Sequence, residues 1–228
     1  MREERRLVCS RGHAFDIARS GYINLLQPQE RRSKKPGDSA EAVAARRRFL
    51  DRGHAAPLLD AIGAMLPREG EILDAGCGEG YYLGSLGRGC GVDISTNAID
   101  LAARRYPECE WVVANADRFI PYADASFDGV LSITGRMNAG EFRRVCRGSL
   151  LVAVAAPDDL IELRGRGRDR VPRTIETFSD FELIRRDRAT TVAELSAQDA
   201  NDILRASYRP RAARPQRVTL SLDLLLFR

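Results

Sequence analysis

The sequence has no C-x-x-C pair, no long apolar run and almost no lysine. Its five cysteines are scattered along 228 residues, and an odd number without regular spacing fits a reducing compartment better than a disulfide framework. The longest apolar run, residues 150–156, is too short to cross a bilayer, and the first ten residues lack the apolar segment of a secretion signal. We therefore expect a cytoplasmic protein with no membrane partner.

Cys9 and His13 are spaced like one arm of a zinc site, but a second arm is missing. A structural zinc ion needs about four ligands in a tetrahedron. The remaining cysteines are far from Cys9 and from one another in the sequence: Cys77, Cys90, Cys109 and Cys146. We therefore expect no stably bound zinc, and stoichiometric zinc in the purified protein would contradict this expectation.

Charge is distributed unevenly along the chain. Residues 1–57 carry 13 basic and 7 acidic side chains, residues 58–159 carry 9 and 15, and residues 160–217 carry 13 and 9. Basic flanks around an acidic middle suggest a polyanionic partner for the flanks and a small cationic ligand for the middle. Solvated surfaces give similar charge runs, and codon usage is another explanation because 34 of the 36 basic residues are arginine.

Apolar periodicity predicts an α/β fold with a mainly parallel sheet and helices on both faces. The first helix is expected from Asp38, as an N-cap in a capping box with Glu41, to Gly53. The last helix is expected within 192–207, before a strand over 217–227. Strands are expected at 71–75, 89–94, 110–114, 127–133 and 149–156, and helices at 55–66, 80–87 and 95–106. Such sheets bind ligands beyond the carboxyl ends of their strands.

The stretch ILDAGCGEG, residues 72–80, is the most specific motif. Gly76, Gly78 and Gly80 form a G-x-G-x-G turn between a strand and a helix, so the backbone can approach a ligand closely at a helix N-terminus. Asp74, two residues before the first glycine, disfavours a pyrophosphate and favours a cation. We therefore predict S-adenosylmethionine as the ligand, because its sulfonium and amino groups are both positively charged.

Two further acids complete the predicted cofactor site. Asp93 ends the next strand and can accept hydrogen bonds from both ribose hydroxyls, and its neighbour Ile94 is included in the site. Asp117 follows the third strand and can accept from the adenine amino group. Tyr81 is expected, with Tyr82, to pack under the cofactor. Each acid alone could be a turn residue, but their order after the glycine turn is typical of a class I methyltransferase.

Five segments between roughly residues 7 and 165 resemble one known family. They are VCSRGHAFDIARSGYINLL, KKPGDSAEAVAARRRFLDRGHAAPL, ILDAGCGEGYY, GVDISTNAIDLAARRYP and LIELRG. They resemble the bacterial 23S rRNA guanine-N1 methyltransferases of the RlmA and TlrB type. The resemblance implies a Rossmann-like, S-adenosylmethionine-dependent methyltransferase domain over residues 38–228, preceded by a truncated zinc-ribbon-like RNA-recognition segment over residues 1–37. It also implies methylation of guanine N1 in large-subunit ribosomal RNA.

The chain departs from the pattern of this family in two places. Cys9 and His13 match one ligand arm of the family's ribbon, but the C-x-x-C arm is absent. After residues 127–133 the family has a Pro-Cys pair and a Lys-Pro-Gly-Gly turn, where this chain has TGRMNAGEF and CRGS. Thr134 and Arg136 are therefore the catalytic candidates for contacting the target base. Because these residues differ from the family pattern, the resemblance implies the family's substrate less strongly than it implies its cofactor.

Three basic segments, RRSKK, ARRRF and RGRGRDRVPR, are expected to hold RNA phosphates. Two alternative functions stay open on sequence alone. One is a methyltransferase for a small molecule, in which the basic flanks are incidental. The other is a non-catalytic S-adenosylmethionine-binding protein that interacts with RNA. The sequence also leaves open a homodimer, the identity of the modified guanine, macrolide resistance and the group that removes the N1 proton.

Overall fold

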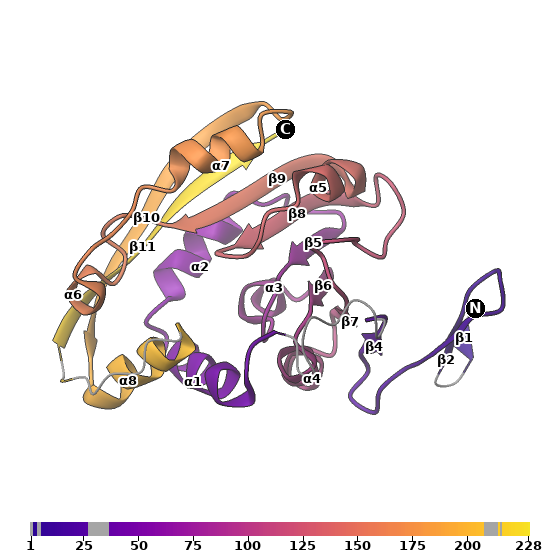
Figure 1. Ribbon diagram of the computed structural model, residues 1–228, viewed down its shortest axis with the longest axis horizontal. Helices are drawn as coiled ribbons and strands as arrows, with labels where there is room; N and C mark the ends of the chain where they lie inside the picture. Colours follow the sequence, from indigo (N-terminus) through magenta and orange to yellow (C-terminus); the bar gives the residue numbers. More distant parts are fainter. Residues whose placement is uncertain (1, 4–5, 27–36, 208–213, 215) are drawn as a thin grey trace.

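The computed structural model describes residues 2–3, 6–26, 37–207, 214 and 216–228. Most of them form one eight-stranded sheet with helices on both faces (Figure 1). The strands of this sheet lie in the order β10-β11-β9-β8-β5-β6-β7-β4. Their bounds are β4 Ile23–Asn24, β5 Ile72–Ala75, β6 Cys90–Asp93, β7 Glu110–Val113, β8 Phe127–Ile133, β9 Cys146–Ala155, β10 Leu183–Leu195 and β11 Gln216–Phe227.

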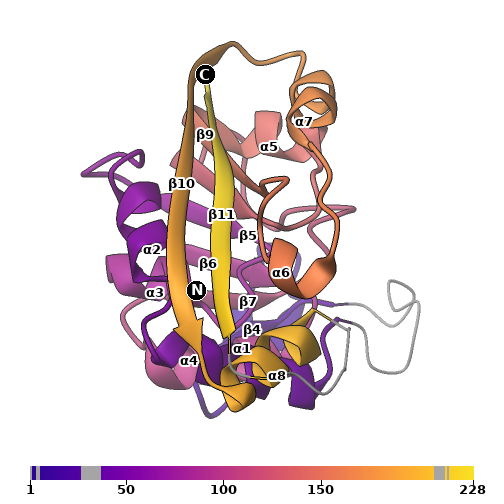
Figure 2. The ribbon, with the colours of Figure 1, turned by 90° about the vertical axis from the view of Figure 1, so that its left-hand side faces the viewer.

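The sheet is parallel from β4 to β9 and antiparallel at its other end. Strand β11 runs antiparallel to both β9 and β10, and the remaining neighbours pair in parallel. Figure 2 shows β10 and β11 as two long strands that run along one side of the molecule. The predicted mainly parallel α/β sheet is therefore confirmed, with an antiparallel pair at one edge.

Two apolar cores lie on the two faces of the sheet, because successive strand residues point to opposite sides. The helices are α1 Ala40–Asp51, α2 Ala56–Gly63, α3 Tyr81–Leu86, α4 Thr96–Arg105, α5 Ala139–Val145, α6 Ile161–Arg164, α7 Val171–Thr177 and α8 Ala197–Ala206. In β5, Ile72 belongs to the core under α1, α2, α3, α4 and α8, and Leu73 belongs to the core under α5 and α7.

Among the residues that the structure describes, no helix has the length and apolar character needed to span a membrane.

The start of α1 differs from the prediction. Ser39, not Asp38, is the N-cap, and its hydroxyl accepts a hydrogen bond from the amide of Ala42. Asp38 lies one residue too early to cap the helix, and its carboxylate pairs with Arg46 instead. The predicted end at Gly53 is confirmed, since this residue follows the last turn with a positive φ of 78°.

The predicted last helix begins later than expected. Residues Val192 to Leu195 continue β10, where exposed and buried side chains alternate as in a strand. Helix α8 then begins after Ser196, which forms a capping box with Asp199. In Figure 2, α8 lies beside α1 at one end of β10 and β11. The last segment of the chain therefore contributes both a sheet edge and a helix over one end of the sheet.

The N-terminal segment forms a separate three-stranded sheet of β1 Arg2–Glu3, β2 Arg6–Val8 and β3 Ala14–Asp16. Within this segment Phe15 and Ile17 are partly buried. The following strand β4 pairs in parallel with β7 at the edge of the large sheet. The segment is thus attached to the main body by an edge strand (Figure 1).

Candidate functional site

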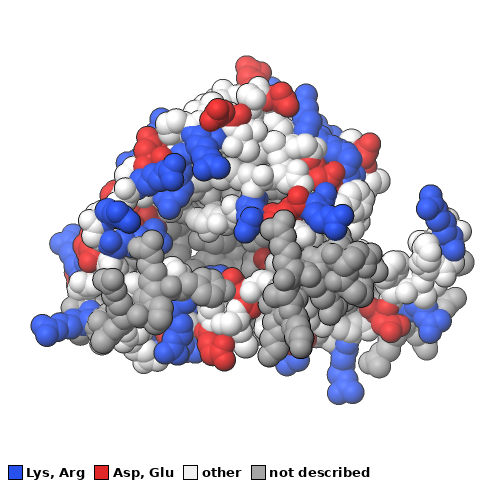
Figure 3. Space-filling model, in the orientation of Figure 1, with Lys and Arg blue, Asp and Glu red and all other residues white. Residues whose placement is uncertain are grey.

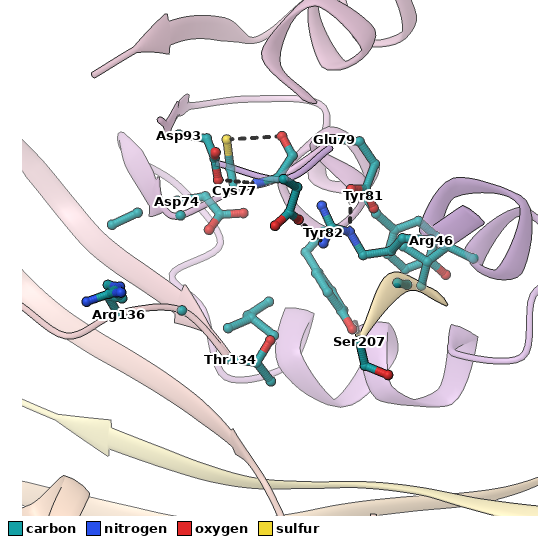
Figure 4. Close-up of a pocket in the computed structure, with 18 of the residues that line it drawn as sticks. Arg46, Asp74, Cys77, Glu79, Tyr81, Tyr82, Asp93, Thr134, Arg136 and Ser207 are labelled. Carbon is teal, nitrogen blue, oxygen red and sulfur yellow. Dashed lines mark hydrogen bonds and ion pairs between the residues drawn. The ribbon is translucent and has the colours of Figure 1, made fainter. Parts of the chain in front are cut away.

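A cavity of about 900 Å³ opens at the carboxyl ends of the parallel strands. Residues of the segments that follow β5, β6, β7, β8 and β9 line it, and α1 and α8 cover the other side. The chain turns in opposite directions from β5 to its neighbours β6 and β8, which is where sheets of this kind bind ligands. Its volume is at the upper end of the usual range for small-molecule sites, about 300–1,000 Å³. Figure 4 shows the labelled side chains that surround it.

The three glycines of the turn after β5 have different physical roles. All three have positive φ angles, 85°, 56° and 77°. A β-carbon at Gly80 would lie 2.4 Å from the ring of Trp111, and one at Gly78 would lie 3.0 Å from the guanidinium of Arg46. At Gly76 the nearest atom would be 3.8 Å away. Gly76 therefore leaves room for a ligand, whereas Gly80, which does not line the cavity, lets α3 pack closely.

Asp74 is a buried carboxylate beside this turn, only 2% exposed. Its Oδ1 atom has no hydrogen-bond partner among the described residues. Burial, with smaller contributions from Asp93 and Glu79, raises the pKa of Asp74 to about 8. A cationic ligand would remove both costs, because it would supply the missing partner and favour the ionised carboxylate. The site therefore fits S-adenosylmethionine, which carries positive charge on its sulfonium and amino groups.

Asp93 connects the glycine turn to the start of α4. Its carboxylate accepts hydrogen bonds from the amides of Gly78, at 3.0 Å, and Ser95, at 2.7 Å. Burial raises its pKa, although these hydrogen bonds oppose that effect. A carboxylate oxygen can accept more than one hydrogen bond, so both oxygens can still bind ribose hydroxyls. Ile94 also lines the cavity. The ribose role of Asp93 stays a prediction.

Tyr81 and Tyr82 begin α3 and both line the cavity. Their rings pack edge to face, with centroids 5.1 Å apart. Tyr82 extends toward Ser207 of the α8 end in Figure 4. Their predicted place under the cofactor is consistent with this arrangement but is not tested by it.

Asp117 and Arg136 lie together on the far rim of the cavity. The Nε atom of Arg136 is 3.4 Å from the carboxylate of Asp117, and their side chains are 81% and 45% exposed. Solvent screens such a pair strongly, so a ligand can displace Arg136 from Asp117 at little cost. The residues predicted to contact adenine and the target base therefore adjoin each other, with Asn115 beside them as a lining residue that the sequence did not single out.

Thr134 directly follows β8 and has an unusual backbone conformation. Its φ of 49° is left-handed, which is an outlier for a β-branched residue and costs on the order of 1–3 kcal/mol. A hydrogen bond from its amide to the carbonyl of Ala153, at 2.8 Å, holds the turn. Leu160 after β9 also lines the cavity with a φ of 51°. Strained residues of this kind often position functional groups, which supports the prediction for Thr134.

The segment ARRRF, expected to hold RNA phosphates, instead forms ion pairs inside the molecule. The pair with Glu79 joins α1 to the glycine turn, the pair with Asp202 joins it to α8, and the pair with Asp51 lies within α1. The pairs are Arg46 with Asp38 and Glu79, both at 2.6 Å, Arg47 with Asp51 at 2.9 Å and Arg48 with Asp202 at 2.6 Å. Arg46 and Glu79 are therefore cavity residues that sequence reasoning missed, although the place of Glu79 inside the glycine turn was a usable signal.

The basic segment 164–173 runs from the end of α6, through an exposed loop over residues 165–170, into the start of α7. Arg166 and Arg168 are exposed, and neither guanidinium forms an ion pair with a described residue, whereas Arg164 pairs with Asp159 at 2.8 Å. On the face drawn in Figure 3, basic side chains gather on both sides of a hollow. The third basic segment, residues 31–35, lies outside the described residues.

Cys9 and His13 face each other in the turn between β2 and β3, with 3.4 Å between Sγ and Nδ1. The described residues contain no group of three or more histidine, cysteine or acidic side chains that could hold a metal ion. The expectation that zinc is not stably bound stays a prediction.

Two family models match the chain. Residues 73–148 match the model described as a methyltransferase domain, and residues 1–34 match the zinc-ribbon model described as "RlmA, N-terminal". The resemblance found in the sequence is therefore confirmed for the N-terminal segment and for the methyltransferase domain. The residues matched by the methyltransferase model include the glycine turn and the segments after β6, β7 and β8 that line the cavity.

Known proteins similar to the chain agree with these matches. A putative 23S rRNA (guanine-N(1)-)-methyltransferase of Bacillus subtilis (strain 168) is 38% identical over 69% of this chain and 61% of its own length. The 23S rRNA (guanine(748)-N(1))-methyltransferase of Streptomyces fradiae is 34% identical over 70% of this chain and 61% of its own length. The chain thus spans less than two thirds of these curated relatives.

A solved structure confirms the fold. A S-adenosylmethionine-dependent methyltransferase of Thermotoga maritima, described as a possible histamine N-methyltransferase, superposes with a TM-score of 0.59 at 16% identity. The likeness covers 82% of this chain and 96% of that one. The chain therefore has the class I fold of S-adenosylmethionine-dependent methyltransferases, as the sequence predicted.

Proposed function

We propose that this protein transfers a methyl group from S-adenosylmethionine to N1 of a guanine in large-subunit ribosomal RNA. The observation that carries the proposal is the cavity itself. One end has an orphaned, buried Asp74 beside the open position at Gly76, and another wall is formed by the strained Thr134. The relatives at 34–38% identity favour ribosomal RNA over a small molecule as the acceptor.

The chain's residues would contribute binding and alignment. S-adenosylmethionine supplies an electrophilic methyl group on a sulfonium. Asp74 would balance the positive charge of the bound donor, and Asp93 and Asp117 would orient its ribose and adenine. Thr134 and Arg136, at the end of β8, would contact the guanine and hold N1 in line with the methyl. Holding two reactants close and aligned accounts for a large part of such rate enhancements.

The acceptor base must leave its stack to reach this cavity. The basic segment 164–173 would hold the flanking phosphates, with Arg166 and Arg168 as exposed cations of its loop. Residues 1–37 would act as the RNA-recognition segment and residues 38–228 as the methyltransferase domain. A ribosomal RNA substrate would also place the protein in the cytoplasm.

The direct test is methyl transfer to RNA. Purified protein is incubated with S-adenosylmethionine carrying a tritiated methyl group and with ribosomal RNA from a strain that lacks N1-methylated guanine. Primer extension then locates the label, because methylation at N1 blocks pairing and stops the polymerase. We expect one stop at a guanine of the large-subunit RNA, lost in an Asp74→Ala variant.

Two other outcomes would contradict the proposal. Label in a small molecule, with no salt-sensitive binding to RNA, would indicate a small-molecule methyltransferase. Binding of both cofactor and RNA without methyl incorporation into any RNA would indicate a non-catalytic protein.

A further inference from the structure

Arg46 of α1 crosses the cofactor cavity at the glycine turn. Its Nε donates to the carboxylate of Glu79 and its Nη1 to that of Asp38, both at 2.6 Å. The side chain is 26% exposed, and Glu79 is almost fully buried. In Figure 4 the guanidinium points toward Glu79 and the turn. Two carboxylates thus fix its position from opposite sides.

The remaining nitrogen of this guanidinium faces the turn without a partner. No described residue accepts a hydrogen bond from Nη2, which lies 3.0 Å from the place where a β-carbon of Gly78 would be. Although burial opposes the charge, the ion pairs with Glu79 and Asp38 raise the pKa of Arg46, so it stays cationic. A charged donor is therefore held ready at the cavity wall.

The charges at this end of the cavity leave one part of the cofactor without a partner. Four carboxylates, Asp38, Asp74, Glu79 and Asp93, line it together with Arg46. They suit the sulfonium and amino groups of S-adenosylmethionine. The same molecule carries a carboxylate on its amino-acid moiety, which these acids would repel. Guanidinium groups bind carboxylates through charge-assisted hydrogen bonds in a fixed geometry.

We propose that Arg46 binds the carboxylate of the cofactor's amino-acid moiety, and that Asp38 and Glu79 position its guanidinium for this contact. The inference deepens the proposed function and rests on it for the identity of the cofactor. Gly78 gains a specific role, since a side chain there would displace the guanidinium. If Arg46 had a purely structural role and only joined α1 to the turn, its replacement would weaken the binding of ligands with and without a carboxylate equally.

The test compares two ligands by calorimetry. S-adenosylhomocysteine has the amino-acid moiety, and 5′-methylthioadenosine has the same nucleoside without it. We expect Arg46→Gln to weaken S-adenosylhomocysteine about 10- to 100-fold, as expected for loss of hydrogen bonds to a charged group. Binding of 5′-methylthioadenosine should change less than about twofold. Arg48→Gln, which removes a paired arginine two residues away on α1, should change neither affinity.

Equal weakening of both ligands by Arg46→Gln would overturn the proposal in favour of the structural role, and so would unchanged binding of S-adenosylhomocysteine. If the variant does not fold, the wild-type protein gives a second test. It should bind S-adenosylmethionine at least tenfold more tightly than the decarboxylated cofactor, and equal affinities would contradict the proposal.

These measurements separate this proposal from the proposed function. Wild-type protein that binds neither S-adenosylhomocysteine nor 5′-methylthioadenosine would overturn the cofactor, and the role of Arg46 with it. Wild-type protein that binds both but methylates no RNA would contradict the proposed reaction, while the comparison of Arg46→Gln with Arg48→Gln would still decide the role of Arg46.

Discussion

Asp74 is a carboxylate whose surroundings oppose its negative charge until a cation arrives. Because burial raises its pKa to about 8, the unliganded site is mostly protonated at neutral pH. In the unfolded chain the same group ionises near its ordinary value, so the extra proton held by the native state stabilises it at low pH. That contribution is lost as the pH rises from about 4 to about 8. Binding of a cationic cofactor would favour the ionised form of Asp74 and so release its proton.

Cofactor binding should therefore depend on pH through Asp74. The affinity of the wild type for S-adenosylmethionine should rise between pH 6 and pH 8, by up to about tenfold per pH unit, and level off above that, since binding the cation releases the proton. Asp74→Asn should bind weakly and without this slope. Calorimetry in buffers of different ionisation enthalpy measures both the affinity and the released proton, and a wild type without proton release would contradict the assignment.

Thr134 carries backbone strain that an asparagine would relieve. Thr134→Asn should raise the free energy of unfolding by about 1 kcal/mol, because asparagine tolerates a left-handed conformation. If the threonine side chain contacts the target base, the same variant should lower the rate of methyl transfer. Ala125→Asn is the matched control, since Ala125 has a φ of 52° in a turn outside the cavity lining. Ala125→Asn should gain stability in urea without losing activity. A lower rate of methyl transfer in both variants would contradict the role of Thr134.

Helix α3 depends on glycines at both ends, and their surroundings differ. Gly80 and Gly87 both have positive φ angles, but a β-carbon would meet Trp111 only at Gly80 and open space at Gly87. Gly80→Ala should therefore lower the free energy of unfolding by about 2–4 kcal/mol, and Gly87→Ala by about 1 kcal/mol, in urea denaturation. Equal losses would show that the close packing of α3 on Trp111 is unimportant.

The elements that define the fold were predictable because their signals are local. The alternating apolar runs and the serine cap at Ser95 depend only on neighbouring residues. The cap at Ser39 was misplaced by one residue because Asp38 is an equally good cap in sequence. The surroundings of the charged side chains were not predictable, because they depend on ion pairs between residues far apart in the sequence. The arginines of α1 resemble an RNA-binding cluster until the fold brings Glu79 and Asp202 to them.

At the scale of the whole molecule, an acidic cavity lies beside a basic surface. The loop after β9 presents Arg166 and Arg168, and the cavity holds Asp74 and Glu79. This separation suits a reaction between a cationic donor and a polyanionic acceptor, because each is attracted to a different part of the surface. The alternation of charge along the sequence anticipated the separation, but it could not say which basic residues remain exposed.

Replacing both exposed loop arginines should weaken RNA binding in a salt-dependent way. The Arg166→Gln and Arg168→Gln double variant should reduce the slope of log affinity against log salt by about 1.4 to 1.8, since each lost phosphate contact removes about 0.7 to 0.9. Arg185→Gln is the control, because this residue lies near the start of β10, at the opposite end of the sheet from the cavity. Filter binding across a salt series measures the slope, and identical slopes in all three proteins would contradict the assigned surface.

The central claim is that this acid-lined glycine turn binds a positively charged methyl donor and not a phosphate-bearing dinucleotide. Titration calorimetry of the wild-type protein with S-adenosylmethionine and, separately, with nicotinamide adenine dinucleotide tests it most directly. We expect saturable one-to-one binding of S-adenosylmethionine, abolished by Asp74→Ala, and no detectable binding of the dinucleotide. Tighter binding of the dinucleotide, or no binding of S-adenosylmethionine by the folded protein, would contradict the account.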